Sequence, residues 1–116
     1  MRQLMLRAAA ILAFGIPSAG AAEEDFKQME TMTTAEFVAL CRNSTAEQKC
    51  TTMLNWVRKD ANARRGSCVA DSITPTQLRL SIVPELESFM ASAPDSRNMR
   101  AYQAIAGLMI TKYCTR

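Results

Sequence analysis

Residues 33–50 read TTAEFVALCRNSTAEQKC, and this stretch decides the fold. It contains two capping boxes, patterns in which a Ser or Thr begins a helix and a Glu follows three residues later. The first box pairs Thr33 with Glu36, and the second pairs Ser44 with Glu47. The stretch therefore predicts a short helix that begins at Thr33 and, after a tight connection, a second helix that begins at Ser44.

The second helix is expected to continue as an amphipathic segment to about residue 65. Its apolar residues recur at helical spacing and form one stripe, made of Cys50, Met53, Leu54, Val57 and Ala61. The helix should end near Arg64, Arg65 and Gly66. Basic side chains complement the dipole of a helix end, and glycine accepts the turn conformation that follows it.

A third helix is expected to begin at Thr74. Thr74 is its cap, Pro75 takes the first helical position, and Gln77 closes a third capping box. Pro84 falls inside this helix and should kink it or remove one of its backbone hydrogen bonds. Its apolar stripe consists of Leu78, Ile82, Leu86 and Phe89.

The fourth helix should follow Pro94, with Asp95 or Ser96 as its cap. Its inner face is expected to consist of Met99, Tyr102, Ala106, Met109 and Tyr113, flanked by Ile105 and Ile110. No segment alternates between apolar and polar residues as a half-buried strand would. The sequence therefore predicts an all-α protein, a small four-helix up-down bundle.

The amino terminus has the features of a secretory signal peptide. Arg2 and Arg7 supply positive charge, residues 8–17 form an apolar run, and small residues precede a cleavage point after about Ala21. The run is shorter than the roughly 20 apolar residues that a membrane-spanning helix needs. We expect a periplasmic protein that is not inserted in the membrane after cleavage.

Cleavage would divide the chain into a signal peptide (1–21), a flexible polar leader (22–32) and a helical domain (33–116). Loss of Arg2 and Arg7 reduces the 14 basic residues to 12, against 11 acidic ones. A nearly neutral mature protein lacks the concentrated basic face that nucleic-acid binding requires. The sequence leaves the oligomeric state open, and a homodimer is compatible with it.

All four cysteines lie in the mature part, and an even number in a short exported chain predicts disulfides. A zinc site is disfavoured because the closest pair, Cys41 and Cys50, is widely spaced and the chain has no histidine. In an up-down bundle these two cysteines share one end, and Cys68 shares the other end with Cys114. The predicted pairs are Cys41–Cys50 and Cys68–Cys114.

The sequence contains no recognisable catalytic constellation. Histidine, the commonest general base, is absent, and the four glycines form no phosphate-binding loop. We therefore expect a protein that is not an enzyme and that needs neither a cofactor nor a metal ion.

Five residues are candidates for partner binding: Trp56, Arg58, Lys59, Arg64 and Arg65. Tryptophan and arginine are enriched at the energetic centres of interfaces. The alternatives are that the tryptophan covers the small core and that the paired arginines complement the end of their helix.

From residue 34 to residue 114 the sequence resembles the Rap/Tai family, exported immunity proteins that protect bacteria against amidase toxins of type VI secretion. The resemblance rests on TAEFVALC at 34–41, Cys50, SC at 67–68, ITPTQL at 73–78, SAP at 92–94 and YC at 113–114. The region 53–60 (MLNWVRKD) has no glycine where the family usually has an aromatic-x-x-Gly stretch.

The resemblance implies a periplasmic protein that binds a peptidoglycan-cleaving amidase toxin and occludes its active site. Two other functions fit an exported helical protein. One is an acid-stress chaperone, since eleven carboxylates and no histidine place any pH switch near the reference pKa of about 4. The other is an envelope adaptor whose partner the sequence does not identify.

Overall fold

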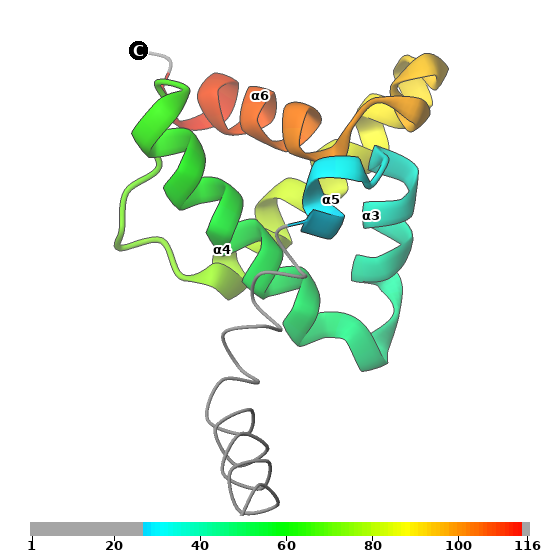
Figure 1. Ribbon diagram of the computed structural model, residues 1–116, viewed down its shortest axis with the longest axis horizontal. Helices are drawn as coiled ribbons and strands as arrows, with labels where there is room; N and C mark the ends of the chain where they lie inside the picture. The colour runs from blue at the N-terminus through cyan, green and yellow to red at the C-terminus, as the bar shows by residue number, and fades with distance from the viewer. Residues whose placement is uncertain (1–26, 115–116) are drawn as a thin grey trace, which may run out of the picture.

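The computed structural model describes residues 27–114, and this part of the chain is helical apart from its turns and connections (Figure 1). Its elements are α3 (Thr34–Arg42), the 3-10 helix η1 (Ser44–Ala46), α4 (Glu47–Arg64), α5 (Pro75–Ser92), the 3-10 helix η2 (Pro94–Asn98) and α6 (Ala101–Tyr113). The all-α prediction is confirmed, and no strand occurs between residues 27 and 114. The predicted signal peptide lies outside the described residues.

Two of the three predicted capping boxes are confirmed. At the start of α3, the Glu36 N–H donates to the Thr33 hydroxyl at 3.2 Å, and the Thr33 N–H donates to the Glu36 carboxylate at 2.9 Å. Thr74 and Gln77 make the same reciprocal pair at the start of α5, at 3.1 and 2.9 Å. These bonds satisfy backbone donors that a helix leaves without partners at its amino end.

The predicted box at Ser44 does not form, and this expectation is wrong. The carboxamide of Asn43 accepts from both the backbone N–H and the hydroxyl of Thr45, at 3.0 and 2.7 Å. These bonds turn the chain into η1 before α4 begins at Glu47, and the cap position of α4 is Ala46, with no side-chain hydrogen bond. A local turn centred on Asn43 therefore replaces the cap.

The start of α6 also differs from the prediction. The segment that holds Asp95 and Ser96 forms η2, and α6 begins at Ala101 without a side-chain cap. The Ala101 N–H donates instead to the carbonyl of Met32 at 2.8 Å. A distant backbone segment therefore satisfies one of the donors that a local cap would otherwise serve.

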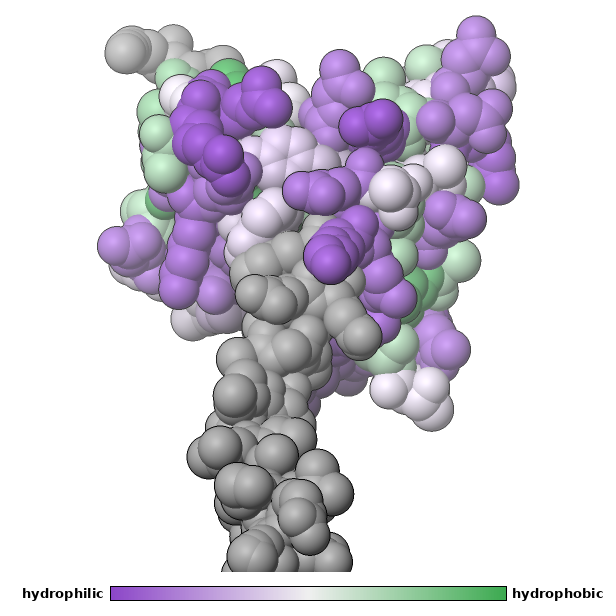
Figure 2. Space-filling view, in the orientation of Figure 1, coloured by the Kyte–Doolittle hydropathy of each residue, from purple (hydrophilic) through white to green (hydrophobic). Residues whose placement is uncertain are grey.

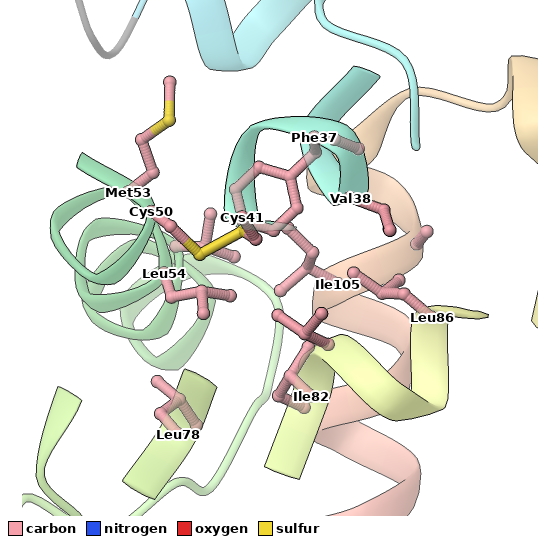
Figure 3. Close-up of a cluster of buried hydrophobic side chains, with 14 of the residues drawn as sticks. Phe37, Val38, Cys41, Cys50, Met53, Leu54, Leu78, Ile82, Leu86 and Ile105 are labelled. Atoms are coloured by element: carbon pink, nitrogen blue, oxygen red, sulfur yellow. A yellow bond between two sulfur atoms is a disulfide. The ribbon is translucent and has the colours of Figure 1, made fainter. Parts of the chain in front are cut away.

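The hydrophobic core lies where all four α-helices meet (Figure 3). Each of these helices contributes buried side chains to it, and they include Phe37, Val38, Met53, Leu54, Leu78, Ile82, Leu86 and Ile105. The predicted stripe of α4 is buried along its whole length. In α6 the centre of the buried face is Ile105, which we expected at the flank, while Tyr102 is only half-buried.

Part of the predicted leader belongs to the folded domain, which corrects the boundary at residue 33. Residues 27–31 form a helical turn, and Met29 is fully buried in the core. The turn is held beside α6 by the Met32–Ala101 hydrogen bond and by the Thr34 N–H, which donates to the Met99 carbonyl at 2.8 Å. The free energy gained by burying the apolar side chain of Met29 outweighs the preference of its polar neighbours for solvent.

The helices cross one another and do not lie side by side as in an up-down bundle. Each of the four α-helices contacts the other three, and α6 lies across the ends of its neighbours in Figure 1. Helix α5 continues through Pro84 as one element. Position 84 has no N–H to donate to the Leu80 carbonyl, so this helical hydrogen bond is missing, as the sequence predicted.

Two disulfides join the predicted pairs of cysteines. Cys41 and Cys50 connect the end of α3 to the first turn of α4, with their Cα atoms 5.1 Å apart. Cys68 and Cys114 connect the loop before α5 to the end of α6, with their Cα atoms 5.2 Å apart. Disulfides of this kind are typical of proteins in a non-reducing, exported compartment.

Candidate functional site

An open groove of about 850 Å³ lies between the carboxyl-terminal half of α4 and α6. It is lined by Glu30, Trp56, Asp60, Arg64, Arg65, Arg100, Tyr102, Gln103, Ala106, Gly107 and Ile110. Figure 2 shows strongly hydrophilic side chains, in purple, over this end of α4, with a paler surface beside them toward α6. The groove therefore combines a charged edge with a less polar floor.

An aromatic pair forms part of the floor of the groove. Trp56 on α4 and Tyr102 on α6 meet edge to face, with ring centroids 5.8 Å apart and an interplanar angle of 66°. Each ring is half-buried because its chain neighbour, Val57 or Ala101, points into the core. Edge-to-face pairs of this kind contribute about 0.5–1.5 kcal/mol beyond the burial of their area.

Asp60 connects the two helices on either side of the groove. Its carboxylate accepts a hydrogen bond from the Tyr102 hydroxyl at 2.5 Å and another from the Arg64 Nε at 2.9 Å. Burial acts to raise the pKa of Asp60, but the hydrogen bonds from Tyr102 and Arg64 outweigh it, and the pKa is lowered. Burial and the same bond to Asp60 raise the pKa of Tyr102. Asp60 is thus ionised and Tyr102 is neutral at pH 7.

Three guanidinium groups line the groove and differ in their partners. Arg64 forms the ion pair with Asp60, four residues earlier on the same helix. The guanidinium of Arg65 lies over the ring of Tyr102, 5.8 Å from its centroid, in cation–π geometry. Arg100 comes from the segment before α6, where its backbone makes an isolated bridge with Thr33.

The structure brings together only some of the five predicted binding residues. Trp56, Arg64 and Arg65 all line the groove. The tryptophan also packs against the core, so both interpretations of this residue apply. Lys59 is exposed on α4 but does not line the groove.

Arg58 is a correction, because its side chain faces inward and is only 6% exposed. Its guanidinium donates to the carbonyls of Ile73 and Ala70 at 2.8 and 3.3 Å, and also to the side chain of Asn55. These bonds hold the loop between α4 and α5 against α4. Arg58 therefore serves the fold and is not available to a partner.

Sequence reasoning missed several residues of the groove, including Asp60, Arg100 and Gly107. Asp60 could have been found, since it stands four residues before Arg64 and this spacing places opposite charges together on a helix. Tyr102 was assigned to the inner face of its helix. Nothing in the local sequence connects Arg100 or Gly107 to α4, because only the crossing of the helices brings them there.

Two further properties of the described residues concern metal ions and membranes. No group of three or more potential metal ligands comes together between residues 27 and 114. In the same part of the chain, no helix has the length and apolar character needed to cross a membrane. Aromatic surface, arginines and an open groove are features of recognition sites.

No family model, curated protein or solved structure matches this chain.

Proposed function

We propose that this protein is an exported immunity-type binding protein that neutralises a peptidoglycan-amidase toxin in the periplasm by occluding its active site. The observation that carries the proposal is the groove between α4 and α6, where Trp56, Tyr102 and arginine side chains are presented to solvent on a disulfide-bonded framework. The likeness of residues 34–114 to the Rap/Tai family supports an amidase toxin as the partner in this proposal.

A binding function agrees with the chemistry of the groove. Its two carboxylates and three guanidiniums contain no nucleophile next to a base, and Asp60 is held ionised by Tyr102 and Arg64. The Cys68–Cys114 disulfide joins the loop that follows α4 to the end of α6, so it links the two sides of the groove covalently. Tyrosine and tryptophan lose little entropy on binding, and arginine is enriched at the energetic centres of interfaces, so this combination favours specific recognition of a protein.

The proposal is tested by co-expression with an amidase toxin that is encoded beside this protein and directed to the periplasm. We expect the full chain to prevent cell lysis, and the purified protein to co-purify with the toxin and inhibit its cleavage of peptidoglycan. A matched control chain that lacks residues 2–21 should remain in the cytoplasm and should not protect. Lysis that continues although the exported protein accumulates would count against the proposal.

A second function, an acid-activated chaperone, is favoured by one observation. The pKa values of Asp60 and Glu87 are lowered by the hydrogen bonds that these carboxylates accept, so acid removes interactions that hold helices together. Circular dichroism and a client-aggregation assay at neutral and strongly acidic pH separate this function from immunity. A chain that stays folded and inactive toward clients in acid is not such a chaperone.

A further inference from the structure

We propose that the groove between α4 and α6 binds an extended acidic segment of the protein partner, with carboxylates paired to Arg65 and Arg100 and an apolar side chain against Trp56 and Tyr102. The proposal specifies the ligand chemistry of the site described above. It rests on the proposed function only for the identity of the partner that carries the segment.

The first argument is the balance of charge in the groove. The groove contains three guanidiniums and two carboxylates, Glu30 and Asp60, and Asp60 already accepts from Arg64 and from Tyr102, so the groove has an excess of positive charge at Arg65 and Arg100. Neither of these two guanidiniums forms an ion pair with any residue between 27 and 114. Arginine binds carboxylates through two parallel hydrogen bonds, so a partner with carboxylates at this spacing would complete the site.

The second argument is Gly107, which lies in the middle of α6 and faces the groove. A Cβ added at Gly107 would have no atom within 4 Å, so packing inside the domain does not require glycine here. Glycine in a helix interior is destabilising relative to alanine. Its lack of a side chain leaves the helix backbone open, which suits the close approach of another polypeptide.

The third argument is the position of the aromatic rings. Arg65 lies over Tyr102, and Trp56 stands beside that ring, so the charged and apolar contacts are adjacent. An acidic segment with one apolar side chain could pair its carboxylates with the arginines and place its apolar side chain against the two rings. A nucleic acid fits less well because the mature chain carries nearly equal numbers of basic and acidic residues.

The test uses the single tryptophan of the chain, Trp56, as a fluorescent reporter inside the groove. The probe is a seven-residue peptide of alternating glutamate and phenylalanine with blocked ends, and the comparison peptide carries lysine in place of every glutamate. We expect the acidic peptide to change the fluorescence of Trp56 in a saturable, salt-sensitive manner, and the lysine peptide to produce no such change.

The double variant Arg65→Glu/Arg100→Glu should weaken binding of the acidic peptide by at least about tenfold, because two attractive contacts become repulsive. The matched controls are Lys59→Glu and Arg97→Glu, which reverse exposed charges outside the groove and should change the affinity less than twofold. Equal binding of the two peptides, or equal weakening in the control variants, would overturn the proposal. So would a Trp56 signal that does not respond to millimolar acidic peptide.

The variant Gly107→Ala tests whether the glycine serves binding or only the stability of the domain. We expect this variant to melt at the same temperature as the parent or higher, and to bind the acidic peptide and the toxin more weakly. Unchanged affinity would contradict close approach at Gly107.

The outcomes also separate this proposal from the proposed function. Binding of the acidic peptide without inhibition of any amidase would contradict immunity and leave the ligand chemistry standing. Inhibition of an amidase that is insensitive to the changes at Arg65, Arg100 and Gly107 would contradict the ligand chemistry and leave immunity standing.

Discussion

At the scale of single residues, the structure separates two arginines that the sequence presents as equivalent. Arg58 and Arg65 both stand on the helix of Trp56, yet the first is buried and the second borders the groove. A buried guanidinium is costly unless it is hydrogen-bonded, and two carbonyl groups of the following loop accept from Nη1 of Arg58, although its Nε has no partner among the described residues. The long side chain of Arg58 joins α4 to the loop that precedes α5.

We expect Arg58→Ala to lower the free energy of unfolding by about 2–4 kcal/mol, because it removes the hydrogen bonds that hold the following loop to α4 and also removes packed side-chain atoms. Lys59→Ala is the matched control on the same helix, and its exposed side chain should contribute less than about 0.5 kcal/mol. Urea unfolding followed by circular dichroism measures both. Similar losses for the two variants would mean that Arg58 is not structural.

The carboxylates of Asp60 and Glu87 predict how stability depends on pH. Both pKa values are lower in the folded protein than in an unfolded chain, where they are about 4. Such a group contributes fully above its unfolded pKa, and the contribution is lost as the pH falls through the lower folded pKa. We therefore expect stability to fall from about pH 5 to pH 2.

The variant Asp60→Asn/Glu87→Gln removes both titrations, so its free energy of unfolding should depend less steeply on pH over this range. Denaturant midpoints measured at several pH values check this expectation. Parallel curves for the variant and the parent would show that other groups determine the acid response.

At the scale of elements, α5 is connected by one ion pair to each of the other α-helices. Glu87 pairs with Arg42 of α3, Arg79 with Glu47 of α4, and Glu85 with Lys112 of α6. Ion pairs at the surface contribute little to stability, because solvent screens them and long side chains lose entropy to form them. Burial of the apolar stripe of α5 therefore supplies most of the free energy that holds this helix in place. The ion pairs are compatible with its observed orientation.

The helix starts predict a contrast among three similar substitutions. Thr33→Ala and Thr74→Ala each remove a side-chain cap and should lower the free energy of unfolding by about 1 kcal/mol. Ser44→Ala should be nearly neutral, since Ser44 does not cap α4. Chemical denaturation of the three variants measures the contrast, and a loss at Ser44 equal to that at Thr33 would contradict the observed start of α4.

At the scale of the whole molecule, the two disulfides differ in both exposure and span. Cys41 and Cys50 are buried and lie 9 residues apart, whereas Cys68 is exposed and is separated from Cys114 by 46. The longer loop restricts the unfolded chain more. The chain-entropy model assigns about 4 kcal/mol to Cys68–Cys114 and about 2.5 kcal/mol to Cys41–Cys50.

Limited reduction of the native protein should therefore break Cys68–Cys114 first, because a reductant reaches Cys68 without unfolding the domain. Alkylation at successive times, followed by peptide mapping, identifies the order. Loss of Cys41–Cys50 first would mean that the buried pair opens by a fluctuation faster than direct attack on the exposed one.

The sequence by itself determined the local features of this protein. Helices α3 to α6, the capping boxes at Thr33 and Thr74 and the buried stripe of α4 follow from residue spacing, because contacts within a few residues govern them. The disulfide pairs could also be predicted, although from a bundle topology that the structure does not have. Only short connections between consecutive helices were needed to bring the right cysteines together.

The tertiary structure alone decided what lies between the helices. It placed Met29 in the core, replaced a cap on α6 with the carbonyl of Met32, turned Arg58 inward and brought Arg100 and Gly107 to α4. Helical periodicity identifies the apolar face of each helix, but it does not determine the angles at which the helices cross. Those angles result from the fit of all the side chains at once, and the groove exists only because of them.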